Sequence, residues 1–338
     1  MDSVTQFVLG ASVGEAVAGK KAGNWAILWG GICGTIPDLD VFLRYFYNQV
    51  EMLGVHRGFT HSILFAILLA PILAYLQVKI HKKQTAKYKD WLWLSFWAVV
   101  THPLLDSFTV YGTQLFQPFS NYPVAFNSIF IIDLVYTLPF IIGLLLILKM
   151  KRESITRRKI NNIVLIFTSF YLLLSVISKL SADSKFEENF SRNNDVIHDF
   201  SSPSPFNIIL WNNIFITADD KAHYAVYSHL DKNDNINYKS IERNSKLIEN
   251  NLSDYPIQQL LWFSRGIYTI EEVDGEIFFI DLRFTRSDFY LEDDGEYIFK
   301  FKLIFEGNKV VSFDRVGPKS SMINSKAFGK LFERVLGE

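Results

Sequence analysis

The feature that most constrains this chain is a series of long apolar runs in its first half. A helix needs about 20 apolar residues to cross a bilayer, and several runs approach that length: 60–80, 91–108, 127–149 and 159–180. Two further runs are less regular, because 3–19 is short and 24–46 is interrupted by the sequence PDLD. We therefore predict an α-helical membrane bundle of about six membrane segments, formed by residues 1–180.

Both irregular runs carry glycines at a spacing that suits helix packing. Gly10 and Gly14 lie in the first run, and Gly30 and Gly34 repeat their spacing in the second. Small residues let helix backbones approach closely within a membrane. We expect these two helices to pack tightly against each other.

Basic loops predict the orientation of the bundle, because such loops remain cytoplasmic. The strongest are 79–89 and 149–159, and Lys20 with Lys21 forms a weaker third. If the passes alternate, one topology places all three basic clusters inside. That topology puts outside the cytoplasm the N-terminus, the loops 47–59 and 109–126, and everything after about residue 181.

The second half of the chain alternates charged and apolar residues, as a water-exposed domain does. Runs such as GIYTIEEVDGEIFFIDLRF and YIFKFKLIFEGNKVVSF alternate with period two and contain the turn signals Asp274-Gly275 and Gly307-Asn308. We expect helical stretches at 238–250 and 255–265. The pattern predicts a polar linker over 181–204, followed by a smaller extracytoplasmic α+β domain with an antiparallel sheet over 205–338.

Composition excludes several classes of protein. A formal net charge of -1 with 49% hydrophobic residues excludes a disordered chain and a strongly basic nucleic-acid binder, so we expect no nucleic-acid partner. The single cysteine, Cys33, cannot form a disulfide within the chain. The sequence MDSVTQFVLG lacks the basic region and cleavage site of a signal peptide, so we expect it to remain in the mature protein.

Ionisable groups in the apolar half form the strongest functional signal. Charged side chains in a bilayer are costly, and they usually pair, line a cavity or bind something. In the predicted topology, groups spread over the first 133 residues all fall near the outer ends of their segments: Asp2, Asp38, Asp40, His56, His61, His102, Asp106 and Asp133. Because no lysines match them, we predict that one or two divalent metal ions bind there. His and Asp ligands suit zinc best, with manganese or iron as alternatives.

Local spacing supports this grouping. His102 and Asp106 are four residues apart, so a helix would present both on one face, although Pro103 could instead kink that helix. PDLD offers two carboxylates after a proline. HRGFTHS offers two imidazoles, with Gly58 suited to a turn and Thr60 to a helix N-cap.

Each of these groups also has a purely structural explanation. His102 and Asp106 could form a buried hydrogen bond between helices, while the PDLD and HRGFTHS groups could be solvated near the membrane surface. Asp2 and Asp133 could cap helices. Arg57 could reach lipid phosphate, or it could hold an anionic group of a substrate. Glu15 lies deeper in its segment, and no partner for it is evident in the sequence.

Several blocks resemble the YdjM-type family of bacterial inner-membrane proteins, which are regarded as metal-dependent hydrolases. The blocks are MDSVTQ, GTIPDLD, HRGFTHS and THPLLDSFTVYGTQLFQPFS, and PSPFNIILWN (203–212) resembles the start of the extracytoplasmic domain of longer members. The resemblance implies a multi-pass protein of the bacterial inner membrane with a His/Asp metal site. It assigns function to Asp2, Asp38, Asp40, His56, Arg57, His61, His102 and Asp106. Members often carry histidine where this chain has Gln6.

These observations favour a metal-dependent hydrolase that cleaves a phosphoester, ester or amide with metal-activated water. Asp38, Asp40 and Asp106 would supply ligands or a base, and Arg57 would stabilise developing negative charge. A site near the outer membrane surface would admit a lipid or lipid-linked substrate sideways, past the aromatic loop 109–123.

Two other classes remain open. One is a metal-stabilised membrane scaffold or binding protein, in which the outer domain binds a protein partner that the sequence does not identify. The other is a transporter, which would need polar groups continuing towards the cytoplasmic side. The number of ligand-type residues exceeds the four that usually close a structural zinc site, which favours the hydrolase.

Overall fold

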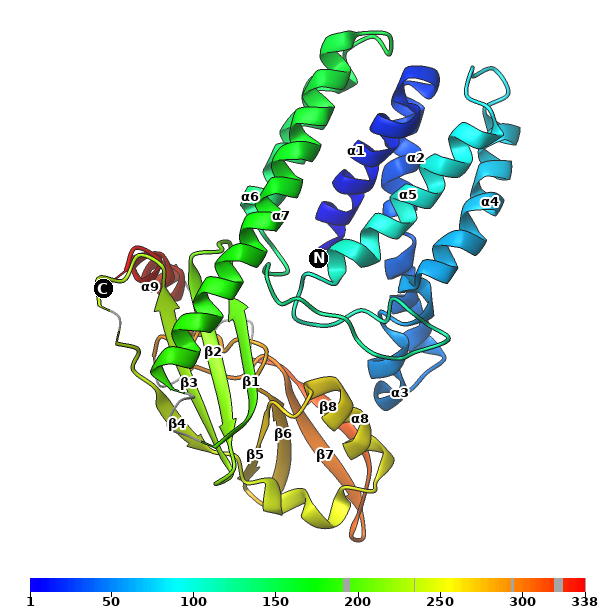
Figure 1. The fold of residues 1–338 in the computed structure, drawn as a ribbon. Helices are drawn as coiled ribbons and strands as arrows, with labels where there is room; N and C mark the ends of the chain where they lie inside the picture. The colour runs from blue at the N-terminus through cyan, green and yellow to red at the C-terminus, as the bar shows by residue number, and fades with distance from the viewer. Residues whose placement is uncertain (191–194, 234, 293–294, 319–324, 338) are drawn as a thin grey trace. The chain divides into compact units, whose positions relative to one another are not determined.

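The computed structural model describes residues 1–190, 195–233, 235–292, 295–318 and 325–337 (Figure 1). It divides into two compact units. The helical unit comprises Met1–Tyr45 and Val55–Val176, and the sheet unit comprises Phe46–Gly54 and Ile177–Glu338. The long helix α7 (Ile155–Asn189) contributes residues to both units.

The helical unit contains helices at all the places where the sequence predicts apolar segments. In chain order they are α1 (Ser3–Ala22), α2 (Asn24–Thr35), the 3₁₀ helices η1 (Pro37–Tyr45) and η2 (Phe59–His61), α4 (Ile63–Ile80), α5 (Tyr88–Asp106), α6 (Leu134–Leu148) and the first part of α7. Apolar side chains of α4 and α7 remain largely exposed, as expected of helices that face lipid.

The prediction of six membrane spans is not supported. Among the described residues, only α4 and α7 are long and apolar enough to cross a membrane, and α2 with η1 would add a third span if that pair, bent by 45°, is counted as one. At 15 residues, α6 is about 22 Å long, which is shorter than a hydrocarbon core of roughly 30 Å. Charged residues reduce the apolar character of α1 and α5: Glu15, Lys20 and Lys21 in α1, and Lys89, Asp90 and Asp106 in α5.

The predicted close packing of the two glycine-containing helices is confirmed. Gly10 of α1 faces Gly30 and Gly34 of α2, and Gly14 faces Ala26 and Gly30. A Cβ atom added at Gly10 or Gly30 would overlap the backbone of the opposite helix. The absence of side chains therefore sets the distance between α1 and α2.

The sheet unit contains two antiparallel sheets, whereas the sequence predicted one. The first has the order β1 (Val196–Pro203), β2 (Leu210–Thr217), β3 (Lys221–Ser228) and β4 (Lys239–Glu242), and the second has β5 (Tyr268–Val273), β6 (Glu276–Asp281), β7 (Lys300–Glu306) and β8 (Lys309–Val316). Both predicted turns are confirmed. Asp274 and Gly275 have positive φ between β5 and β6, and Gly307 does so between β7 and β8.

Helices cover these sheets. The end of α7 packs Ala182 and Phe186 against Trp211 and Phe215 of β2. The remaining helices of the unit are α3 (Gln49–Val55), η4 (Ser245–Asn251), α8 (Tyr255–Ser264) and α9 (Ser325–Val335). The stretch 238–250, predicted to be helical, instead forms β4 before η4 begins. The predicted linker 181–204 holds the last turns of α7 and strand β1, and its residues 191–194 lie outside the described part of the chain.

Candidate metal centre

Four side chains from three separate segments converge in the helical unit. Asp38 of η1, His61 of η2, and His102 and Asp106 of α5 each offer a ligand atom, and these atoms all lie within 4.8 Å of one another. His102 Nε2 lies 3.2 Å from His61 Nε2 and 3.3 Å from Asp38 Oδ1. Both Nε2 atoms lie 3.6 Å from Asp106 Oδ2. The sequence prediction placed all four residues in one site.

Local backbone geometry explains which residues take part. Helix α5 remains α-helical through Pro103, so His102 and Asp106 share a face, as i and i+4 residues do. After Pro37, η1 is a 3₁₀ helix with three residues per turn, so Asp38 and Asp40 point in different directions. Asp38 turns towards the two imidazoles, and Asp40 turns towards the segment that follows α3.

The hydrogen bonds of the imidazoles leave their Nε2 lone pairs facing each other. His102 Nδ1 lies 2.6 Å from the carbonyl oxygen of Gly34, which can only accept, so Nδ1 donates and neutral His102 has its lone pair on Nε2. His61 Nδ1 lies 3.1 Å from Thr60 Oγ1 and 3.4 Å from Asp40 Oδ2. Among the described residues, Asp106 Oδ2 accepts no well-aligned hydrogen bond, although Arg57 Nε forms an ion pair with it at 3.1 Å. A divalent cation fits this set of two nitrogen and two carboxylate donors, and the outer hydrogen bonds match those of metal-bound histidines.

Asp40 and His56 lie beside this cluster. Asp40 Oδ1 is 2.9 Å from His56 Nδ1, and its Oδ2 accepts from the backbone N–H of Arg57 at 3.0 Å and from Thr60 Oγ1 at 3.2 Å. The His56 ring packs edge-on against Tyr111. Asp40 therefore holds the HRGFTH turn in place, and it contacts His61 on the side opposite to the cluster.

Arg57 is buried and adopts a strained backbone conformation. Its φ of 56° lies in the left-handed region, which non-glycine residues seldom occupy outside constrained sites. Its Nε lies 3.1 Å from Asp106 Oδ2, its Nη1 donates to Thr109 Oγ1 at 2.9 Å, and its guanidinium stacks on Tyr111. The guanidinium thus faces the cluster and does not extend towards lipid.

Comparison with known proteins identifies the family. A family model described as YdjM inner membrane protein matches residues 1–182, which is more than half of the chain. The chain belongs to the YdjM family. The protein YfhP of Bacillus subtilis (strain 168), described as uncharacterized, is 35% identical over 139 residues. That alignment covers 38% of this chain and 41% of YfhP, so the chain spans less than half of that relative. No solved structure matches.

Other predicted residues of this YdjM-family chain cap helices. Asp2 caps α1, accepting from the backbone of Val4 and Thr5, and Asp133 caps α6, accepting from Tyr136 N at 2.9 Å and from the Tyr171 hydroxyl at 2.8 Å. The structure thus places Asp2, Asp133, Asp40 and His56 outside the four-residue cluster. Ser62, and not the predicted Thr60, caps α4.

The structure also brings residues to the site that sequence patterns did not assign to it. Gln6 Nε2 donates to Asp106 Oδ1 at 2.8 Å, and the amino group of Met1 contacts the same oxygen. Gln6 occupies the position at which members of the YdjM family often carry a histidine. The roles of the Gly34 carbonyl, Thr109 and Tyr111 depend on tertiary contacts, for which the sequence carries no local signal.

Proposed function

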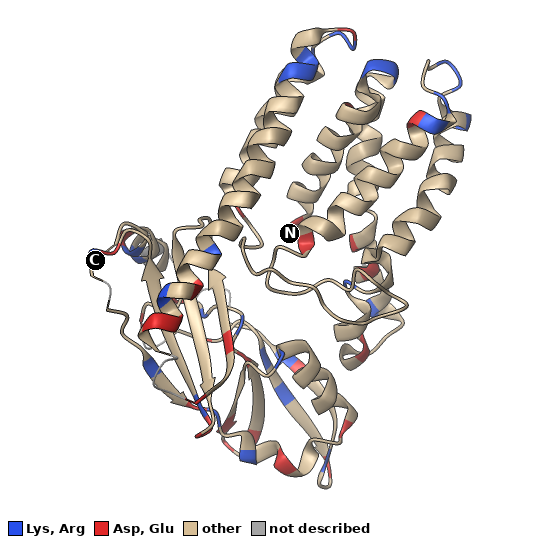
Figure 2. Cartoon of the chain, viewed as in Figure 1, with Lys and Arg blue, Asp and Glu red and all other residues tan. Residues whose placement is uncertain are grey.

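We propose that this chain is a metal-dependent hydrolase of the bacterial inner membrane that cleaves a phosphoester, ester or amide bond in a lipid or lipid-linked substrate. The observation that carries the proposal is that ligand atoms of two imidazoles and two carboxylates lie within 4.8 Å of one another, an arrangement that suits a divalent cation. Zinc suits these ligands best. The cluster lies near the N-terminus, because the Met1 amino group contacts Asp106. Within the helical unit, Lys and Arg gather at the helix ends far from the N-terminus (Figure 2). That arrangement supports a site at the outer face.

Each residue of the centre has a distinct task in this proposal. Asp38, His61, His102 and Asp106 hold the metal, which when bound lowers the pKa of water and polarises the bond to be cleaved. The side chain of Asp38 is 24% exposed, whereas the other three are fully buried. Substrate would therefore approach past Asp38. Asp40 orients His61, and Arg57 stabilises negative charge that develops beside Asp106.

The surroundings of the centre favour a lipidic substrate. Large apolar side chains are exposed on η1 and on the loop after α5: Phe42, Tyr45, Phe116, Phe119 and Tyr122. The same loop contacts the centre, because Gln114 N donates to the carbonyl of Arg57 at 3.0 Å. Aromatic side chains favour the interface between membrane and water. A substrate with an acyl chain would meet these residues before reaching Asp38.

A metal-stabilised scaffold is the second candidate, because four protein ligands can close a structural site. Transport receives less support, since Glu15, deeper in the unit, is fully paired with Arg157. The hydrolase and the scaffold differ in two measurable ways. A scaffold would bind metal and melt earlier when the metal is chelated, but it would hydrolyse nothing.

The testing experiment measures metal content and hydrolysis of the full chain in detergent. A D38N/H102Q variant is compared with wild type and with D219N/H223Q, which removes the same residue types from the sheet unit. We expect stoichiometric metal in wild type and in the control, and loss of metal in D38N/H102Q. When lipid phosphates and esters are screened as substrates, only the metal-loaded protein should cleave one of them. If the wild type binds metal but hydrolyses no substrate, the scaffold function is favoured over the hydrolase. If the wild type stays metal-free after reconstitution with zinc and manganese, both the hydrolase and the metal-stabilised scaffold are overturned.

A further inference from the structure

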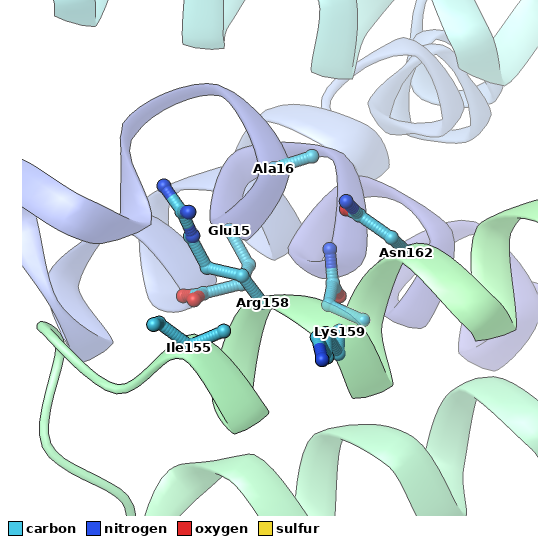
Figure 3. A pocket seen from close by; sticks show the side chains of 7 residues that line it. Glu15, Ala16, Ile155, Arg158, Lys159 and Asn162 are labelled. Carbon is cyan, nitrogen blue, oxygen red and sulfur yellow. The ribbon is translucent and has the colours of Figure 1, made fainter.

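A second polar site lies between α1 and α7, among the helix ends that carry the basic residues. A cavity of about 400 Å³ opens there, lined by Glu15 and Ala16 of α1 and by Ile155, Arg158, Lys159 and Asn162 of α7 (Figure 3). It belongs entirely to the helical unit. Neither the metal centre nor the family description accounts for it.

The carboxylate in this cavity is already neutralised. Arg157 donates from Nε and Nη2 to the two oxygens of Glu15 at 2.7 and 2.6 Å, and its Nη1 donates to Asn24 Oδ1 at 2.8 Å. Both side chains are almost completely buried. A side chain at Gly19 would overlap the carboxylate of Glu15, so this glycine makes room for the pair. Glu15 is consequently committed to Arg157.

Two cations beside this pair lack a carboxylate partner among the described residues. Arg158 and Lys159 are exposed, and within the described part of the chain neither forms an ion pair. The local charge is therefore positive, and the side-chain amide of Asn162 adds donors at the rim of the cavity. Guanidinium, ammonium and amide donors match the oxygens of a phosphate group.

The helix surface next to Lys159 is apolar. Ile163, Ile166 and Phe170 follow Lys159 at intervals of four, three and four residues, so all four lie along one face of α7, and the three apolar side chains are exposed. Eleven residues of helix span about 16 Å, roughly half of a hydrocarbon core. A phosphate at Lys159 with an acyl chain along this face has the dimensions of one lipid in one leaflet.

We infer that this cavity binds the phosphate of an anionic phospholipid, with the acyl chain lying along Ile163, Ile166 and Phe170. The inference depends on the membrane location of the family and on the unpaired cations, and it does not depend on the metal centre.

The test is a titration of the full-length protein in detergent with phosphatidylglycerol, followed by native mass spectrometry. The variant R158Q/K159Q is compared with K82Q/K83Q, which removes the same charge from another basic loop. Because each basic residue near an anionic lipid contributes about fivefold in affinity, we expect R158Q/K159Q to bind about 25-fold more weakly. The control should bind like wild type. Equal losses in both variants, or no loss in R158Q/K159Q, would overturn the assignment.

Two further arms separate lipid from free phosphate and charge from folding. Glycerol 3-phosphate and inorganic phosphate should compete only weakly, because they lack the acyl chain. Competition as strong as that of phosphatidylglycerol would show a soluble-phosphate site and overturn the lipid. The charge-preserving variant R158K/K159R should keep binding within about threefold. If it loses lipid as R158Q/K159Q does, the two side chains act through structure and the proposed contact is wrong.

Discussion

Asp40 is the residue whose replacement best separates metal ligands from the groups that orient them. Among the described residues, its carboxylate contacts the cluster through His61, and it also accepts from Arg57 N and Thr60 Oγ1. The change Asp40→Asn keeps one acceptor oxygen. Because two donors face Oδ2, we expect the amide oxygen to remain there and the amide nitrogen to turn towards His56.

The size of the effect follows from these contacts. Loss of an outer partner of a metal-bound histidine lowers metal affinity about 10- to 100-fold, or about 1.4–2.7 kcal/mol. In Asp40→Asn the oxygen beside His61 remains but loses its charge, so we expect the lower value, about tenfold. Asp40→Ala removes both oxygens and leaves Arg57 N unpaired, so we expect about 100-fold.

The assay is competition for zinc against a chromophoric chelator, using purified full-length variants in detergent. Asp133→Asn is the matched control, because Asp133 is an equally buried carboxylate that caps α6 away from the cluster. Unchanged affinity in Asp40→Ala would refute the orienting role. Complete loss of metal in Asp40→Asn, equal to that in Asp38→Asn, would show instead that Asp40 is a direct ligand, as the sequence prediction had it.

Two other predictions concern stability. Gly30→Ala should destabilise the helical unit by about 1–3 kcal/mol, because the new methyl group overlaps the backbone of Gly10. The control Gly329→Ala in α9 meets no neighbouring atom and should be neutral or stabilising. Thermal unfolding of both variants in detergent checks this, and equal melting temperatures would contradict it. Burial lowers the pKa of His229 below its usual value near 6.5, so the unfolded chain takes up a proton first as pH falls. The contribution of His229 to the stability of the sheet unit should therefore be fully present above about pH 6.5 and decline below it. Amide exchange of β2 and β3 is measured at pH 7.5 and 5.5 in wild type and in His229→Gln. The loss of protection at pH 5.5 should be smaller in the variant.

The sequence predicted features that depend on short-range rules. Glycines repeated every four residues identified the α1–α2 contact, and Asp274-Gly275 identified a hairpin turn, because both signals are local. The four cluster residues were predicted because polar groups in apolar segments need a common explanation. The helix positions in the first half were predicted because a long apolar run is a local signal, whereas the helix predicted at 238–250 was wrong.

Features that depend on geometry between segments were not predicted. The number of spans was overestimated because the helices α1, α5 and α6 are apolar enough to pack but too polar or too short to cross a bilayer alone. The pairing of strands into two sheets cannot be read from alternation. Which of the two PDLD carboxylates lies beside the imidazoles depends on how η1 packs against η2 and α5, and the sequence does not give that packing.

The same electrostatic reasoning applies at both ends of the helical unit, with opposite sign. Near the N-terminus, Arg57 and the Met1 amino group contact Asp106. Among the described residues no Lys or Arg pairs with Asp38, which lies beside the two imidazole Nε2 atoms, so the missing partner there is positive. At the other end, Arg158 and Lys159 stand beside a carboxylate already committed to Arg157, so the missing partner is negative. Because the two sites share no residue, loss of lipid in R158Q/K159Q should leave zinc affinity unchanged, and loss of zinc in D38N/H102Q should leave lipid affinity unchanged. A variant that loses both ligands would have lost the fold of the unit, and neither site could be inferred from it.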